Sequence, residues 1–209
     1  MHGRIHFFWV ILAVLCAAAA LIACIYAGLF GQIYNQPGGS PQETVVRFFD
    51  SLKNGDYTAA YDCLGDYNTL GLETEPDSEE ARQILQALRT SYGYTLKGEC
   101  SVDGLNAEQT VHFRYLSIRK TEDAVASRVN TVLEEKIAEL PQEEVYADGG
   151  GYQTGLTDLV YAETLSTVLR NVDGVAAETD LEIHLQYLDG TWKIITDRSL
   201  MSALIGGEM

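Results

Sequence analysis

The sequence predicts an α+β domain in which helices pack on one face of an antiparallel sheet of about four strands. Three observations lead to this class. Apolar residues recur with the helical period between residues 43 and 88. Two pairs of alternating segments, at 94–118 and 181–197, each enclose a turn signal, as β-hairpins do. Further helical stripes lie between the two hairpins, and this grouping of helices and strands is typical of α+β folds.

The first two helices are predicted to meet at an elbow. The letters "SPQE" from Ser40 supply an N-cap, a proline at the first helical position and a glutamate three residues after the cap. The helix then runs to "NG" at 54–55, which is a C-terminal stop signal. Asp56 can cap a second helix from Tyr57, and the apolar spacing loses phase between the two helices. Two helices that each bury their own stripe explain this break.

The middle of the chain predicts a helix, a hairpin and two longer helices. The first of these helices follows "PDS" from Pro76. The strands "YTLKGECSV" and "AEQTVHFRYLSI" are joined by a turn at Asp103. A long helix opens at Thr121 and stops at Pro141, and another begins at about Thr157.

The last hairpin has a two-residue turn, Asp189-Gly190, of the type that favours tight hairpins, and this turn determines the strand register. The expected pairs are Tyr187 with Trp192, Leu185 with Ile194, and Ile183 with Thr196. A short amphipathic helix at 199–205 ends the domain. The alternation of both hairpins places one set of side chains on a core or pocket face: Phe113, Tyr115, Leu185, Tyr187, Trp192 and Ile194.

The N-terminal part predicts a membrane anchor. Residues 7–30 form a run of 24 residues without a charge, long enough for about 36 Å of helix and hence for a bilayer crossing. Residues 1–6 are then a short cytoplasmic N-terminus, and 31–42, rich in Gly and Pro, are a linker. Residues 43–209 form the extracytoplasmic domain, with a helical insertion at 121–172.

The charge distribution sets the orientation and excludes some partners. All 30 Asp and Glu follow the uncharged run, against 13 Lys and Arg, so the C-terminal part carries a formal charge of −17. Arg4 precedes the run, and the positive-inside tendency places the N-terminus in the cytoplasm and the domain outside. Nucleic acid and anionic lipid are excluded as partners of such an acidic domain, because both need clustered Lys and Arg.

The four cysteines leave two pairs of alternatives open. The letters "LIAC", ending at Cys24, resemble the lipobox of bacterial lipoproteins, so the N-terminal segment is either an uncleaved helix or a lipoprotein signal with lipidation at Cys24. Cys63 and Cys100 either form a disulfide, which would contribute about 4 kcal/mol by loop closure, or remain two buried thiols. Neither has a second Cys or His at zinc-site spacing, and no metal or other cofactor is expected.

No catalytic motif is expected in the domain. His112 and His184 alternate away from the apolar positions of their strands, which places them on the outer face of the sheet. The apolar face carries no ionisable group except tyrosine. The tyrosines on periodic apolar faces are predicted to be core residues: Tyr57, Tyr61, Tyr115, Tyr161 and Tyr187.

Two stretches carry a resemblance to a known family. "VVRFFDSLKNGDYTAAYDCL" and "YLDGTWKIITDRSLMSAL" resemble the nuclear transport factor 2-like superfamily, and more closely its membrane-anchored or lipoprotein members of unassigned function in Gram-positive bacteria. The resemblance covers roughly residues 43–118 and 178–205. It implies a curved sheet wrapped against helices into a cone, which often has a pocket at its open end.

These features predict a non-catalytic binding or interaction module, tethered outside the cytoplasmic membrane, that meets a protein, a cell-wall component or a small ligand. One alternative is a small enzyme with its active site in the cone. Another is a structural ectodomain of an envelope assembly. A buried ionisable group with a partner, inside a pocket, would favour the enzyme.

Overall fold

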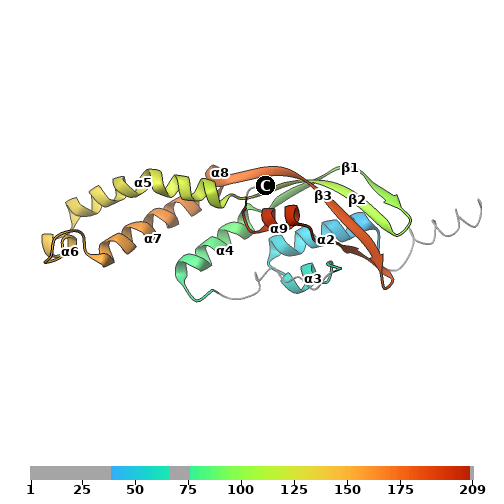
Figure 1. Ribbon diagram of the computed structural model, residues 1–209, viewed down its shortest axis with the longest axis horizontal. Coiled ribbons are helices and arrows are strands. Elements are labelled where there is room, and N and C mark those ends of the chain that lie inside the picture. The colour runs from blue at the N-terminus through green and yellow to red at the C-terminus, as the bar shows by residue number, and fades with distance from the viewer. Residues whose placement is uncertain (1–38, 66–75, 208–209) are drawn as a thin grey trace, which may run out of the picture.

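The computed structural model describes residues 39–65 and 76–207 of the 209-residue chain, and its helices and strands follow the predicted order (Figure 1). The described elements are α2 (Pro41–Asn54), α3 (Tyr57–Tyr61), α4 (Glu79–Ser91), β1 (Gly93–Asp103), β2 (Asn106–Leu116), α5 (Ile118–Glu139), α6 (Gln142–Val145), α7 (Thr154–Arg170), α8 (Val172–Val175), β3 (Ala176–Leu188), β4 (Thr191–Ile194) and α9 (Arg198–Leu204).

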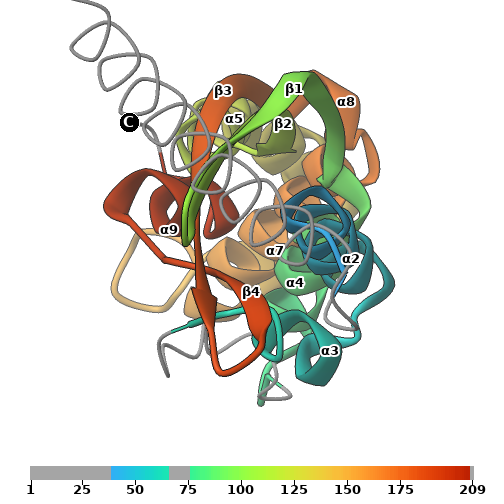
Figure 2. The same cartoon turned by 90° about the vertical axis from the view of Figure 1, so that its right-hand side faces the viewer.

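The α+β class is confirmed, because helices pack on a four-stranded antiparallel sheet of order β1-β2-β3-β4. The sheet bends along its length, and α2, α3 and β4 lie together at the end of the molecule that faces the viewer in Figure 2. Within the described ranges, no helix combines the length and apolarity that a bilayer crossing needs. The anchor expected at 7–30, Cys24 and most of the linker lie outside these ranges.

The register of the last hairpin is largely as predicted. Tyr187 pairs with Trp192, and Leu185 pairs with Ile194. The predicted pair of Ile183 with Thr196 is wrong, because β4 ends at Ile194. One further hydrogen bond continues the register, since the Ile195 N–H donates to the His184 carbonyl at 2.9 Å, and the chain then turns to α9, which begins at Arg198.

The two edges of the sheet differ from regular strands. The pairing of β1 with β2 shifts between Lys97 and Ser101, where Gly98 has a φ of +67°. At the other edge, the main chain of Cys63 to Gly65 lies beside β4, since the Ile194 N–H donates to the Cys63 carbonyl at 2.8 Å. The first hairpin turns over Gly104 and Leu105, one residue later than predicted.

The elbow between α2 and α3 forms as predicted. The Glu43 N–H donates to the Ser40 hydroxyl at 3.1 Å, and the Ser40 N–H donates to the Glu43 carboxylate at 2.8 Å, which completes a capping box. Gly55 ends α2 in the left-handed conformation, with φ of 73°. Asp56 then caps α3 by accepting from the Ala59 N–H at 3.0 Å.

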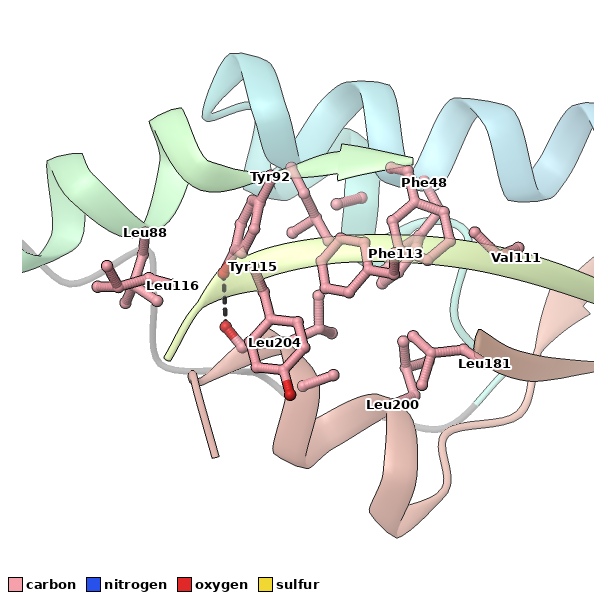
Figure 3. Packing of buried hydrophobic residues seen from close by; sticks show 14 of the residues in the cluster. Phe48, Leu88, Tyr92, Val111, Phe113, Tyr115, Leu116, Leu181, Leu200 and Leu204 are labelled. Carbon is pink, nitrogen blue, oxygen red and sulfur yellow. Dashed lines mark hydrogen bonds between the residues drawn. The ribbon is translucent and has the colours of Figure 1, made fainter. Parts of the chain in front are cut away.

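The main core lies between α2, α4, α9 and the inner face of the sheet (Figure 3). Phe113 of β2 lies at its centre, with ring centroids 5.1 Å from Phe49 and 5.5 Å from Tyr92. Helix α9 closes this core with Leu200 and Leu204, and the Tyr92 hydroxyl donates to the Leu204 carbonyl at 2.5 Å. Burial raises the pKa of the Tyr92 phenol, which therefore stays neutral and keeps donating this bond.

Helices α5 and α7 pair as a hairpin that projects beyond the sheet (Figure 1). Helix α5 begins three residues before the predicted Thr121, because Ser117 caps it and accepts from the Lys120 N–H at 3.2 Å. Helix α7 likewise begins earlier, at Thr154. A second, small core holds the far end of the hairpin together; its buried members are Val145, Leu156 and Val160.

Candidate functional site

The inner face of the sheet is where the sequence predicted a core or a pocket. Its predicted residues lie in the main core at exposures of 0–4%: Phe113, Tyr115, Leu185, Trp192 and Ile194. Tyr187, the remaining one, is half-buried at the rim and meets the Trp192 ring edge to face, with centroids 5.3 Å apart. Aromatic and aliphatic side chains from α2, α4 and α9 fill the space above this face (Figure 3).

A shallow cavity of about 260 Å³ opens at the rim, between the first half of α2 and β4. Its polar wall carries charge of both signs, since Arg47 and Glu43 come from α2 and Lys193 comes from β4. The Lys193 ammonium donates to the Asp62 carbonyl, which holds it against the α3 end of the elbow. Trp192 forms part of the wall, and its indole N–H is buried without an acceptor among the described residues.

Cys63 lies behind this cavity as a free thiol. The Nε–H of Arg47 donates to its sulfur at 3.1 Å, and the thiol donates to the Ala59 carbonyl at 3.3 Å. Burial raises the pKa of the Cys63 thiol, although Arg47 opposes this effect. A raised pKa keeps the sulfur in the neutral form, which is a poor nucleophile.

The second cysteine of the domain is also free. Cys100 lies on β1, at the opposite edge of the sheet from Cys63, whose main chain runs beside β4. Of the two alternatives that the sequence left open, the structure therefore has two separate thiols and not a disulfide. Burial raises the pKa of the Cys100 thiol as well.

The two histidines lie on the outer face of the sheet, as predicted. The His112 side chain is 35% exposed, and the His184 side chain is 46% exposed. His112 belongs to a group of ionisable side chains on β1, β2 and β3: its Nδ1 lies 2.7 Å from Asp180, and the Lys97 ammonium donates to the same carboxylate at 2.8 Å. The hydrogen bonds from Lys97 and then from His112 lower the pKa of Asp180.

This outer group is open to water, which limits what it can do chemically. Solvent screens charges at exposed positions, so an activating partner has less influence on a histidine there than in a closed pocket. The nitrogen of His184 lies 3.5 Å from Glu108, at the long end of an ion pair. Among the described residues, no three His, Cys, Asp or Glu side chains are grouped in a way that could hold a metal ion.

Comparisons with known proteins add one structural likeness. No protein-family model matches the chain, and no curated protein matches it. A solved structure that resembles it is YcdA, a candidate lipoprotein from Bacillus subtilis subsp. subtilis strain 168, with 16% sequence identity and a TM-score of 0.40. The similarity covers 89% of this chain but 55% of YcdA, so the chain spans about half the length of that protein. The superfamily resemblance stays a prediction from the sequence motifs.

One exposed tyrosine was wrongly predicted to lie in the core, and a second surface feature was not predicted from the sequence. Tyr161 is 53% exposed and not in the core, because the hairpin that carries it extends beyond the sheet. Tyr146 and Tyr152 form a stacked pair at the end of the hairpin, with ring centroids 5.8 Å apart. The signal for this pair is present in the sequence as two tyrosines that flank the turn-forming letters "ADGGG".

Proposed function

We propose that the protein is a non-catalytic binding or interaction domain, held at the outer face of the cytoplasmic membrane by its N-terminal segment. The packed inner face of the sheet is the observation that carries this proposal. The superfamily resemblance implies a cone that often has a pocket at its open end, but on the inner face of the sheet Phe113, Leu185 and Ile194 are 0–2% exposed and enclosed by the chain's own helices. A protein, a cell-wall component or a small ligand would then bind to the outer surface.

The position at the membrane is supported by the sequence. The uncharged run at 7–30 precedes every acidic residue of the chain, and a charge of −17 follows it. Attachment through an uncleaved helix and attachment through lipid on Cys24 both place residues 43–209 outside. An acidic surface suits an exported domain that stays soluble beside the membrane.

Protease added to intact protoplasts is expected to degrade the domain, because the proposed orientation exposes it to the medium. A cytoplasmic protein in the same cells should stay intact and serves as the control for lysis. Full protection of the domain would contradict the orientation. The Cys24→Ser variant separates the two anchors: unchanged size and membrane attachment indicate the helix, and blocked processing indicates the lipoprotein.

One observation favours a small enzyme as the second candidate. The hydrogen bond between His112 and Asp180, 2.7 Å long, orients the imidazole as a carboxylate does in general acid–base sites. The exposure of both groups weakens this candidate, because a substrate would have to be held on an open sheet face. The wall of the rim cavity includes neither His112 nor Asp180.

His112→Ala is expected to rescue the phenotype of cells that lack the protein as fully as the wild type does. His184→Ala is the matched control, since it removes the other exposed histidine, which has only a long contact with Glu108. Immunoblotting of each variant checks that it accumulates. If a stable His112→Ala protein fails to rescue while the His184→Ala protein succeeds, the enzyme hypothesis is favoured over the binding-domain hypothesis.

A further inference from the structure

The end of the α5–α7 hairpin has an ordered, exposed surface whose residues do not contribute to the main core. This end, residues 140–156, is called the hairpin tip below. It lies at the far end of the molecule from α2 and β4 (Figure 1). Its buried residues belong to the small second core of Val145, Leu156 and Val160, separate from the main core.

The tip has a defined conformation. Tyr146 and Tyr152 pair as an antiparallel bridge, and the Ala147 N–H donates to the Gly151 carbonyl at 3.1 Å inside it. Gln153 ties the tip to α6, since its side-chain amide donates to the Tyr146 carbonyl at 3.1 Å and its N–H donates to the Val145 carbonyl at 2.9 Å. These bonds hold the two tyrosine rings in a stack without further support from the sheet.

The stacked rings are open to solvent. Tyr146 is 46% exposed and Tyr152 is 44% exposed, although stacking already buries one face of each ring. The rings therefore offer apolar and π surface to a partner. Little side-chain conformational entropy is lost on binding, because the ring positions are already fixed in the free protein.

The surface around the rings is acidic. From residue 137 to 162 the sequence has five acidic residues and no Lys, Arg or His: Glu139, Glu143, Glu144, Asp148 and Asp158. All five are exposed. In the described part of the chain, Glu143, Glu144 and Asp148 form no ion pair. The tip thus combines negative potential with electron-rich ring faces, and both attract cations.

We propose that the hairpin tip binds a Lys- and Arg-rich segment of another polypeptide. The inference deepens the proposed function by naming a class of partner, and it rests on that function. Arg and Lys side chains can lie over the faces of Tyr146 and Tyr152 while Glu143 and Glu144 pair with their charges. A second copy of this chain does not fit, because its net charge of −16 repels an acidic surface.

The binding test uses the full chain in nanodiscs of uncharged phosphatidylcholine, which do not attract basic peptides themselves. The probe is a fluorescein-labelled peptide of Lys-Gly-Arg-Gly repeats, about 12 residues long, and its affinity is measured by fluorescence anisotropy. A Glu-Gly-Asp-Gly peptide of the same length is the negative control. The proposal requires that the basic peptide bind and that the acidic one not bind.

Two charge variants distinguish the tip from the overall acidity. Glu143→Gln with Glu144→Gln is expected to weaken binding about tenfold, since each lost ion pair lowers the affinity about threefold. Glu122→Gln with Asp123→Asn removes the same charge from exposed positions at the base of α5 and should change affinity less than about twofold. Equal losses would mean that the peptide senses net charge only, which overturns the proposal.

Two ring variants test the role of the tyrosines. Tyr146→Leu with Tyr152→Leu keeps apolar side chains but removes the π faces, and we expect about a fivefold to tenfold loss of affinity. Tyr146→Phe with Tyr152→Phe keeps the faces and should bind as the wild type does. Tyr161→Leu, at an exposed tyrosine of α7 outside the pair, is the matched control. Circular dichroism checks that each variant is folded.

Failure of this proposal differs from failure of the proposed function. If no basic peptide binds, or if the Leu pair binds as well as the Phe pair, the tip is not a site for basic segments, but another outer surface can still serve as the binding face. Self-association through the tip, seen by sedimentation and lost with the Leu pair, would also overturn it. The proposed function itself fails if the domain is fully protected from protease in intact protoplasts, or if a stable His112→Ala protein fails to rescue while His184→Ala succeeds.

Discussion

Phe113→Ala is expected to lower the free energy of unfolding by about 3–5 kcal/mol, as large aromatic truncations in cores do. Phe113 has no exposed surface, and its ring contacts Phe49, Tyr92 and Tyr115 in one aromatic cluster. Removal of the ring leaves a cavity between α2 and the sheet that these neighbours cannot fill without moving. Urea unfolding of the full chain in detergent, followed by circular dichroism, measures the change.

Thr110→Ala, three residues earlier on β2, is the matched control for Phe113→Ala. Thr110 is exposed on the outer face of the sheet, so its truncation should cost less than about 1 kcal/mol. A loss below about 1 kcal/mol for Phe113→Ala as well would mean that the inner face is not packed as described. The argument against a pocket on this face would then lose its basis.

Gly206→Ala should be the most disruptive of the glycine substitutions near the end of the chain. Its φ is +80°, and an added Cβ would lie 2.5 Å from the Leu116 carbonyl oxygen and 3.0 Å from Ile118. The backbone after α9 would have to move away, and the hydrogen bond from the Ile118 N–H to the Gly206 carbonyl, 2.9 Å long, would be lost. We expect a loss of about 2–4 kcal/mol in the same unfolding measurement.

Gly104→Ala separates the conformational cost from the steric one. Gly104 has a φ of +60° in the first hairpin, but an added Cβ meets nothing within 4 Å. Its substitution should therefore cost only about 1–2 kcal/mol, the usual penalty for a left-handed residue with a side chain. Similar losses at Gly104 and Gly206 would show that α9 does not dock as tightly as the contacts indicate.

The elements that were predictable from the sequence are those with short-range signals. The capping box of Ser40 and Glu43 involves residues three apart, and the Asp189-Gly190 turn sets the register of residues that are neighbours across it. Both signals act within a few residues, so no knowledge of the rest of the fold was needed. Alternation then assigned the faces of the strands, including the outer position of His112.

The parts that could not be predicted depend on contacts between distant segments. The end of β4 at Ile194 follows from the path to α9, and the exposure of Tyr161 follows from how far the hairpin extends beyond the sheet. The rim cavity needs α2 and β4 to meet, and these are more than 100 residues apart. The apolar periodicity of one segment does not indicate which distant segment it will contact.

The irregular edges of the sheet have a consequence for the molecule at high local concentration. A flat, open edge strand can recruit a strand from a neighbour, and repeated recruitment leads to aggregation. Here the kink at Gly98 interrupts β1, and the main chain of Cys63 to Gly65 occupies the free side of β4. Neither of these two edges offers a straight row of free N–H and C=O groups. Crowding of copies should thus not lead to strand pairing between molecules at these two edges.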